Sequence, residues 1–585
     1  MTSRAWAAAF RAGLVVVAAG CGGSGKSTNP DAGAAGSGAI GGVAGGARGG
    51  TGGVVAGTGG SGIAGTGGGA VAGGGGGALG GTGGGIAGTG GGAVAGTGGG
   101  GGGGTGGGAL AGTGGGAVAG SGGAVAGSGG GGIAGTGGVA GSGGAAGATC
   151  GPIATGAGGA KTGTPEICTF QIDAALSLTI PTVGVINWST DLAGLTEARI
   201  EFTLNEPAPD TLNRGSGGKI DVTGTTHRAL MLGLKAGRTY TYRIVATGAG
   251  GQTCTSPDRM LATCTSDKAP TVARTAMNAA AQMRGFIIVT PGVQGISMTR
   301  PRAPLLAYII DADGDVVWWT DAQVETSRAL MDWDGATLWT IRTGGGEVRR
   351  TSMDGTLIQT TTPGAVGAHH DFAVLPGGTL AFLVPTLDST GSSDLVERAP
   401  DGTTKTVVHL DSKIYKSPNS FHANAIRYHV ADDSYTVGDR DAALIIKLTR
   451  QGKVLWQLGG SCTGAPAPKC AASALGGSTH GHAMLDNGNL LVFRNSAYQA
   501  TEYRLTEGAT SLSASTVWSY QSAGVGSDYL GDVQRLPNGN TLVTFSTGGQ
   551  IHEVTPSGAV VQTITANYFG YSNFRETLYG PPLPY

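Results

Sequence analysis

Histidine is scarce in this chain, and its placement is the first sign of chemistry. Nine histidines occur among 585 residues, and three short motifs hold five of them: His369-His370-Asp371, His422-Ala423-Asn424 and His480-Gly481-His482. An imidazole titrates near neutral pH, so it can act as nucleophile or as general acid and base, and it also binds transition metals. If these rings converge, they define a catalytic or ligand-binding site.

The three motifs stand at nearly the same distance ahead of a repeated turn. The distance is five residues for His370 and His480 and six for His422. The turns begin at Leu375, Tyr428 and Leu485, and a fourth copy begins at Leu536. A single such histidine would more often cap its own strand, but three in phase favour convergence on one site, because equal phase in a repeat means equal height in the structure.

A second turn, Asp-Gly or a variant of it, recurs between the first ones every 41 to 56 residues. Its glycines are Gly314, Gly355, Gly402, Gly452, Gly508 and Gly558. A unit of this length with four strands is typical of a propeller blade. We therefore predict a six-bladed β-propeller over residues 268–585, with segment 571–575 adding a strand to the first blade. A β-solenoid is the alternative, although its repeats are usually shorter.

The region before the repeats, residues 149–267, is predicted to be a small β-sandwich. Segments 198–204 and 240–246 alternate apolar and polar residues, as half-buried strands do. Leu234-Lys-Ala-Gly237 followed by Tyr240 and Tyr242 resembles a fibronectin type III domain, with Trp188 as the core tryptophan. The region holds no cluster of catalytic residue types, so we interpret it as structural. The fold class is all-β.

Most of the 118 glycines lie in residues 21–148. The only charged side chains between residues 22 and 148 are Lys26, Asp31 and Arg48. So little apolar side chain does not offset the entropy of ordering glycine, which predicts a disordered linker that acts as a tether. An ordered glycine-rich bundle is the alternative.

The N-terminus predicts export. Arg4 and Arg11 precede a short apolar run, and Ala18-Ala19-Gly20-Cys21 follows it. The run is too short to span a bilayer and is typical of a signal peptide at residues 1–20. The small residues before Cys21 resemble a lipoprotein cleavage site, with an ordinary signal peptide as the alternative. We expect a lipid anchor in the bacterial cell envelope, on the periplasmic side or at the cell surface.

Cysteine usage and charge agree with an exported protein rather than a nucleic-acid binder. Cys462 and Cys470 stand eight residues apart in a loop and are predicted to pair, whereas the pairing of the other four is left open: Cys150, Cys168, Cys254 and Cys264. The net charge of −1 argues against a nucleic-acid partner, which would call for a basic face.

The propeller region, from residue 273 to residue 585, resembles the bacterial arylsulfate sulfotransferases. The resemblance rests on His-His-Asp before Leu-Pro-Gly-Gly, on His-x-Asn followed by an arginine, and on a histidine before Leu-Asp-Asn-Gly-Asn. It implies transfer of a sulfuryl group from an aryl sulfate donor to a phenolic acceptor through a sulfohistidine. Neither a cofactor nor the nucleotide sulfate donor PAPS is expected.

Carried over residue by residue, the resemblance implies a catalytic set and a substrate-binding set. The sulfurylated nucleophile falls on His480, the acid and base on His422, and the cation for the sulfonate on Arg440. The substrate-binding residues are Asn424 and His370, with His369 as the near alternative to His370 and His482 as the alternative to His480.

Two sites depart from the family pattern. Asp439 stands before Arg440, where the family commonly has serine, and an ion pair of Arg440 with Asp439 or Asp441 is the competing interpretation of that arginine. The third histidine motif is followed by Phe493-Arg494-Asn495-Ser496 instead of Phe-Asp-Asn-Gly. Both departures could reshape acceptor binding.

Other classes stay open at this point. One is a non-catalytic surface propeller for adhesion or ligand binding, and another is a quinone-dependent dehydrogenase, although the tryptophans lack six-fold placement. We expect no metal, with a site of His370, Asp371, His480 and His482 as the alternative. The oligomeric state is left open, with a homodimer as one option.

Overall fold

A computed structural model of the chain describes two parts of it. The first is a series of short strands between residues 48 and 141. The second is residues 168–582 apart from 206–214, 221–225, 293–305, 322–325, 344–345, 362–366, 387–390, 416–420 and 473–474. The predicted signal peptide, Cys21 and Cys150 lie outside the described residues.

The regular structure of the described residues is β-strand, apart from one 3-10 turn at Asn495–Ala497. The all-β fold class is therefore confirmed. No helix in this part of the chain is long and apolar enough to cross a membrane.

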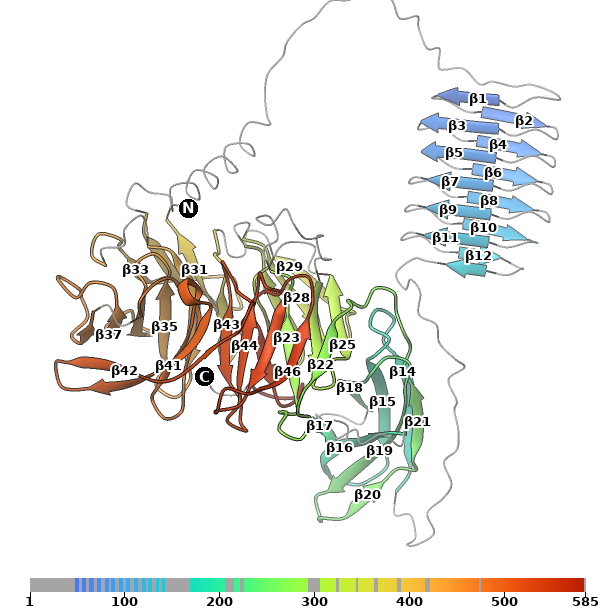
Figure 1. Cartoon of the computed structure of the whole chain (residues 1–585). Helices are drawn as coiled ribbons and strands as arrows, with labels where there is room; N and C mark the ends of the chain where they lie inside the picture. Colours follow the sequence, from blue (N-terminus) through green and yellow to red (C-terminus); the bar gives the residue numbers. More distant parts are fainter. Residues whose placement is uncertain are drawn as a thin grey trace, which may run out of the picture. The chain divides into compact units, whose positions relative to one another are not determined.

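The chain divides into two compact units, residues 1–143 and 144–585. In the first unit, parallel strands stack into two sheets (Figure 1). One sheet contains β1 (Arg48–Thr51), β3 (Ile63–Gly67), β5 (Leu79–Gly83), β7 (Val94–Thr97), β9 (Leu110–Thr113), β11 (Val125–Ser128) and β13 (Val139–Gly141). The other contains β2 (Val55–Thr58), β4 (Val71–Gly74), β6 (Ile86–Thr89), β8 (Gly102–Thr105), β10 (Val118–Ser121) and β12 (Ile133–Gly135).

These strands contradict the predicted disordered linker between Arg48 and Gly141. The prediction weighed apolar side chains against glycine entropy and left out backbone pairing. Parallel pairing aligns successive repeats, so that like residue types form columns over most rungs, as with Ile63, Leu79 and Val94. Repetition of the same short segment therefore supplies the hydrogen bonds that a single glycine-rich segment lacks.

The second unit begins with two antiparallel sheets that share one core. The first sheet contains β14 (Phe170–Leu176), β15 (Gly184–Thr190) and β18 (Thr226–Met231). The second contains β16 (Leu195–Leu204), β17 (Gly215–Ile220), β19 (Thr239–Gly248), β20 (Thr253–Thr255) and β21 (Arg259–Ala262). Trp188 of the first sheet and Tyr242 of the second belong to the same buried cluster. The hydroxyl of Tyr240 accepts a hydrogen bond of 2.8 Å from the backbone N–H of Lys235, which fixes the predicted Leu-x-x-Gly turn.

Six further sheets follow, all antiparallel except that β38 pairs in parallel with β37 in the fourth. The first contains β47 (Asn573–Arg575), β23 (Phe286–Val289), β24 (Leu306–Asp311) and β25 (Val316–Asp321), and the second β26 (Ala329–Met331), β27 (Thr337–Ile341), β28 (Val348–Ser352) and β29 (Ile358–Thr361). The third contains β30 (Phe372–Val374), β31 (Leu380–Pro385), β32 (Ser393–Arg398) and β33 (Thr404–Leu410), and the fourth β34 (Ala423–His429), β35 (Ser434–Asp439), β36 (Leu444–Thr449), β37 (Val454–Gly459) and β38 (Cys470–Ala471). The fifth contains β39 (Thr479–Met484), β40 (Leu490–Arg494), β41 (Gln499–Glu507) and β42 (Leu512–Gln521), and the sixth β43 (Asp532–Arg535), β44 (Thr541–Phe545), β45 (Gln550–Val554), β46 (Val560–Thr565) and β22 (Ala273–Ala276).

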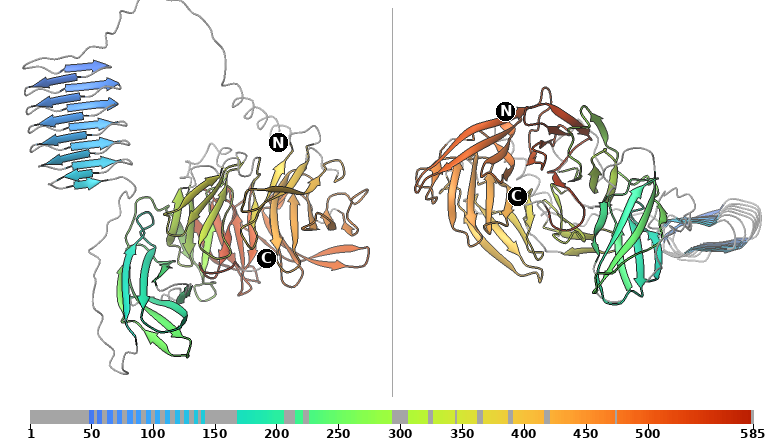
Figure 2. Two further views of the ribbon diagram at one scale, coloured as in Figure 1. Left: turned by 180° about the vertical axis from the view of Figure 1, so that it is seen from behind. Right: turned by 90° about the horizontal axis from the view of Figure 1, so that it is seen from below.

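The six sheets stand around a common centre in a propeller-like arrangement (Figure 2). The predicted Asp-Gly type turns join the third and fourth strands of each sheet, counted from the inner edge, and the Leu375, Tyr428, Leu485 and Leu536 turns join the first and second. Segment 571–575 behaves as predicted, because β47 pairs with β23. At the other end of the repeat, β22 pairs with β46, so both ends of the region are held in sheets with distant strands.

Two disulfides are formed within the described residues. Cys462 pairs with Cys470, as predicted from their spacing. Cys168 pairs with Cys254 and joins the segment just before β14 of one shared-core sheet to β20 at the edge of the other. Cys264 is also disulfide-bonded.

Candidate functional site

The predicted histidines of three different sheets meet at one place. His369 and His370 lie just before β30, His422 just before β34, and His480 within β39. The ring centroids of His369 and His422 are 4.6 Å apart, and those of His370 and His480 are 6.0 Å apart. The equal phase of the motifs therefore brings four imidazoles together, which we call the histidine cluster.

Two consecutive residues, His369 and His370, both face this cluster. In an ordinary strand their side chains would point to opposite faces. His370 instead has a φ of 54°, in the left-handed region that a residue with a Cβ rarely adopts. The turn brings the two ring centroids to 3.8 Å from each other. A strained residue at such a position is typical of a functional site.

His480 is held by a residue that the sequence analysis noted only as a departure from the family pattern. The Nδ1 atom of His480 lies 2.6 Å from Oδ1 of Asn495. The Nδ2 atom of Asn495 donates to the carbonyls of Ser527 and Leu530, at 2.8 and 2.7 Å. Because the amide nitrogen is committed to carbonyls, Oδ1 must accept from His480, and the proton of that imidazole lies on Nδ1. The Nε2 atom keeps its lone pair, and it is buried without a hydrogen-bond partner.

Burial makes the histidine cluster electrically neutral. It lowers the pKa of His369 to about 4 and that of His480 to about 3, because a charged imidazolium is poorly solvated there. The same cause holds the pKa of His370 and of His422 well below 6.5. At neutral pH the cluster therefore offers unprotonated nitrogens for nucleophilic attack or for metal binding.

Arg440, the predicted cation, lies next to the histidine cluster, where its backbone N–H donates to the carbonyl of His422 at 3.2 Å. Its charge contributes to the lowered pKa of all four cluster histidines, so the guanidinium lies within electrostatic reach of them. Its Nε also donates to Oδ1 of Asp441 at 2.7 Å. The two interpretations of Arg440 from the sequence are thus not exclusive.

Asp439, the carboxyl that replaces the usual serine, turns into the protein. It accepts a hydrogen bond from the backbone N–H of Ala442, and burial raises its pKa to about 7. The backbone N–H of the next residue, Arg440, donates to the carbonyl of His422 at 3.2 Å. Asp439 therefore supports the segment that carries His422.

Asn424, which was predicted to bind substrate, contacts the backbone of the neighbouring strand β39. Its Nδ2 donates to the carbonyl of Thr479 at 2.7 Å, and the side chain is completely buried. This contact joins β34 to β39 at the residue before His480. In the described structure Asn424 positions the His480 strand, instead of presenting both amide hydrogens to a ligand.

His482 is separated from the histidine cluster. Its Nε2 bonds to Oγ1 of Thr436 at 2.9 Å, and the neighbouring side-chain charges that affect its pKa are those of Arg427 and His429. Residues two apart in a strand normally share a face, but the register of β39 shifts between Thr479 and His482. Geometry therefore favours His480 over His482 as the residue of the cluster.

Gly481 makes this bulge feasible. A Cβ on Gly481 would meet Oδ1 of Asp532 at 2.0 Å and its Cα at 2.6 Å, so no other residue fits between β39 and β43. The backbone N–H of Gly481 donates to the carbonyl of Gly531 at 2.9 Å.

A buried quartet of charges, which the sequence analysis missed, lies next to the cluster. Arg427 donates to Asp371 at 2.6 Å and to Asp532 at 2.8 Å, and Arg328 donates to the same two carboxylates. The four residues come from or adjoin the inner strands β26, β30, β34 and β43. They are buried, and they tie four sheets together beside His370 and Gly481. Asp371 is thereby removed from the metal site considered from the sequence, since both of its oxygens are bonded to arginines.

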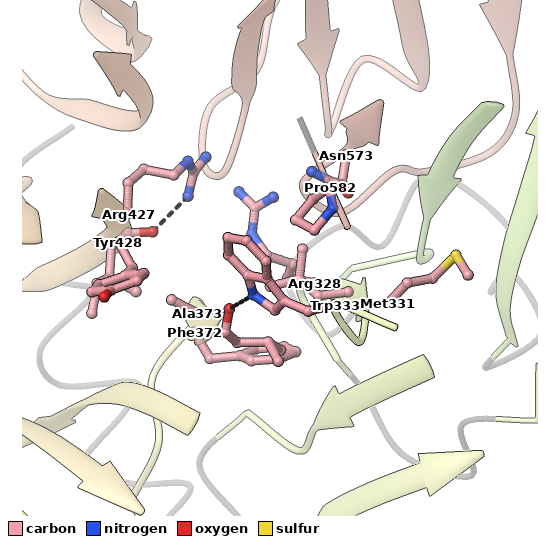
Figure 3. Close-up of a pocket in the computed structure, with 12 residues that line it drawn as sticks. Arg328, Met331, Trp333, Phe372, Ala373, Arg427, Tyr428, Asn573 and Pro582 are labelled. Carbon is pink, nitrogen blue, oxygen red and sulfur yellow. Dashed lines mark hydrogen bonds between the residues drawn. The ribbon is translucent and has the colours of Figure 1, made fainter. Parts of the chain in front are cut away.

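A pocket with about 490 Å³ of empty volume, open to solvent, adjoins this quartet (Figure 3). Arg328 and Arg427 line it together with the rings of Trp333, Phe372 and Tyr428. Trp333 is fixed by a hydrogen bond of 2.7 Å from its Nε1 to the carbonyl of Val374. No cluster histidine lines this pocket, so it is distinct from the site of the histidines.

Comparison with known proteins assigns the class. The family described as Arylsulfotransferase (ASST) matches residues 272–568, which include the whole histidine cluster. The chain therefore belongs to the arylsulfotransferase family, a family of sulfotransferases.

The similarity to solved structures is too low to indicate a function for this chain. Virginiamycin B lyase from Staphylococcus aureus is 11% identical, with 50% of this chain and 87% of that chain covered and a TM-score of 0.30. The β-propeller domain of Cps50 (Swd1) from Myceliophteria thermophila is 12% identical, with 50% and 88% covered and a TM-score of 0.33. Among curated proteins, none matches the sequence.

Proposed function

We propose that this protein moves a sulfuryl group from a phenolic sulfate ester to an acceptor phenol through a sulfohistidine on His480, without a nucleotide sulfate donor. The observation that carries the proposal is the state of His480. Its Nδ1 is bound to Asn495, while its Nε2 is buried, lacks a hydrogen-bond partner and belongs to a neutral ring. A buried, unprotonated nitrogen of this kind can act as a nucleophile towards an electrophile such as the sulfur of a sulfate ester.

In the first step, Nε2 of His480 attacks the sulfur of the bound aryl sulfate. The N–S bond forms while the bond between sulfur and the phenolic oxygen breaks, and the electron pair leaves on that oxygen. A proton on His422 neutralises the phenolate, and phenol departs.

In the second step, the acceptor phenol gives its proton to neutral His422 and its oxygen attacks the sulfur. The N–S bond breaks, its electron pair returns to Nε2 of His480, and the new sulfate ester leaves. Two displacements on one enzyme group give ping-pong kinetics.

The proton on His422 must be acquired with the substrate. In the empty site burial keeps the pKa of His422 well below 6.5, so the ring is neutral. An anion bound among neutral imidazoles favours the protonated form of a neighbouring ring. The sulfate ester thus brings in the charge that makes His422 an acid, whereas a phenol, which is neutral, meets a base.

The other cluster residues serve the sulfonate oxygens. Arg440 supplies a planar set of donors and a positive charge. His370 lies beside both His480 and His422, with ring centroids at 6.0 and 6.1 Å, and can donate from one ring nitrogen. Asn424 acts on the nucleophile indirectly, through the carbonyl of Thr479.

We further propose that the six sheets are the blades of a closed propeller and that the shared-core sheets are a fibronectin type III-like sandwich. Export and lipidation at Cys21 remain part of the proposal. They are tested in a bacterial host by following whether Cys21→Ser moves the protein from the membrane fraction to the soluble fraction.

A chromogenic aryl sulfate tests the activity. Phenol release should show a burst of one phenol per active site, and a second phenol should accelerate the steady state. Intact-mass analysis away from acid should detect a sulfuryl adduct on the peptide that contains His480. If no aryl sulfate gives either burst or adduct, the protein is a non-catalytic binding propeller.

A further inference from the structure

Three histidines of the cluster have the arrangement of a metal site. His369, His370 and His422 each offer one ring nitrogen, and these nitrogens all lie within 4.8 Å of one another. We propose that these three residues bind a divalent transition-metal ion of the zinc class, and that the bound ion blocks sulfuryl transfer. The binding stands on the geometry of the three residues, and the inhibition rests on the function proposed above.

The first support is the orientation of the rings. The Nδ1 atom of His369 lies 2.8 Å from the carbonyl oxygen of Ala423, which can only accept, so Nδ1 carries the proton and Nε2 the lone pair. A backbone carbonyl on the far nitrogen is the usual second partner of a metal-binding histidine. The Nε2 atom of His422 is buried and has no hydrogen-bond partner. Small ring movements would place each of the three nitrogens about 2.0–2.1 Å from a bound ion, which is the Zn–N distance that zinc prefers.

The second support is the choice of ligand atoms, which selects the metal. Neutral imidazoles suit zinc, cobalt, nickel and copper, whereas magnesium and calcium require oxygen ligands. The nearest carboxylate in sequence, Asp371, has both oxygens bonded to arginines. The positive charge of Arg440 opposes any cation, but Arg440 is paired with Asp441. The site should therefore accept borderline transition metals and discriminate against hard ions.

The consequence for catalysis follows from the residues involved. A metal on His422 occupies the nitrogen that must exchange a proton with the phenol. The same ion is bound by His370, whose ring centroid is 6.0 Å from that of His480, the proposed nucleophile. Binding of the ion and turnover should therefore exclude each other.

Cobalt reports on the site without any need for activity. The full-length protein is treated with a chelator, dialysed and titrated with Co²⁺, while the visible absorption of the Co²⁺ d–d bands is followed. We expect one equivalent to bind, Zn²⁺ to abolish the bands, and Mg²⁺ to leave them unchanged. Both His422→Asn and His369→Asn should weaken Co²⁺ binding by at least about tenfold. The matched control is His409→Asn, because His409 is half-exposed and bonds to Asp394 away from the cluster.

The activity arm separates this proposal from the proposed function. Zn²⁺ should suppress phenol release by the wild-type protein, and a chelator should restore it. Absence of Co²⁺ bands in a protein that turns over aryl sulfates overturns the metal site alone. Bands in a protein with no activity on any aryl sulfate overturn the proposed function alone. Bands that survive in His369→Asn and His422→Asn proteins, each with a wild-type melting curve, place the metal elsewhere and overturn the assignment.

Discussion

The Nδ1 atom of His480 and the Oδ1 atom of Asn495 lie 2.6 Å apart, in a hydrogen bond whose direction is set by two backbone carbonyls on the other side of the amide. This contact decides which nitrogen of His480 is free. It also turns a residue outside the predicted catalytic set into the residue that orients the nucleophile.

Replacing Asn495 should therefore slow the chemical step more than it weakens substrate binding. For Asn495→Ala we expect a fall of kcat by about 10- to 100-fold with little change in KM, because the ring loses its fixed tautomer. Asn495→Asp keeps an acceptor but adds a negative charge, which should raise the pKa of His480 and move the acid limb of the burst rate to higher pH. Equal kinetics in all three proteins would mean that the contact has no catalytic role.

The register of β39 predicts that only one of its two histidines is sulfurylated. His480→Asn should abolish both the phenol burst and the adduct. His482→Asn should keep the adduct and lower the melting temperature, since His482 is buried and bonded to Thr436. Peptide mapping after incubation with donor alone distinguishes the two, and an adduct that persists in the His480→Asn protein would assign the nucleophile to His482.

The burst rate should not fall as the pH is lowered from about 8 to about 5. Burial lowers the pKa of His480 to about 3, so the ring stays neutral and nucleophilic throughout this range. Rapid-mixing measurements with a donor whose own charge is constant check this. A loss of rate on the acid side centred near 6.5, the ordinary pKa of histidine, would contradict the burial of His480.

The same burial should make the free energy of unfolding depend on pH on the acid side of neutrality. The pKa values of His369 and His480 lie near 4 and 3 in the folded protein and near 6.5 in the unfolded chain. Below 6.5 the unfolded state takes up more protons than the folded state does. The free energy of unfolding from urea titration should therefore fall as the pH is lowered from 7 towards 4, and His369→Asn should reduce that slope.

The buried charge quartet should be far more sensitive to mutation than a surface ion pair. Arg427→Met leaves Asp371 and Asp532 short of one buried partner, which should cost about 3–5 kcal/mol in the free energy of unfolding. Arg450→Met removes a partly exposed pair with Glu397 and should cost about 1 kcal/mol or less. Urea unfolding of the two variants provides the comparison, and similar losses would show that the quartet does not hold the inner strands together.

The two compact units predict that chemistry needs only the second. A chain starting at Thr149 should keep the wild-type kcat and KM, because every proposed catalytic group lies after Ala368. Activity of the purified shortened protein, with its melting curve as the folding control, tests this. Loss of turnover in a folded protein would give the glycine-rich unit a role beyond that of a spacer.

The sequence by itself determined the features that follow from its repeats. The two interleaved turns are enough to predict repeated four-stranded sheets, because a hairpin turn is a local property of Asp, Asn and Gly. The phase of His370, His422 and His480 then predicts their convergence, since each sheet repeats the same local geometry. The spacing of Cys462 and Cys470 predicts their bond for the same local reason.

Tertiary structure decided what depends on contacts between sheets. The choice of His480 over His482 follows from a bulge in β39 that exists because Gly481 lies against Asp532, a contact between strands of neighbouring sheets. The quartet of Arg328, Arg427, Asp371 and Asp532 likewise joins different sheets. The orientation of Asn495 towards His480 depends on its bonds to Ser527 and Leu530, which lie 32 and 35 residues further along the chain. A single glycine-rich segment has too little apolar side chain to predict a strand, and these strands form only where successive repeats pair. Local sequence patterns determine the turns and the length of the repeat. The orientation and burial of side chains depend instead on which distant strands become neighbours.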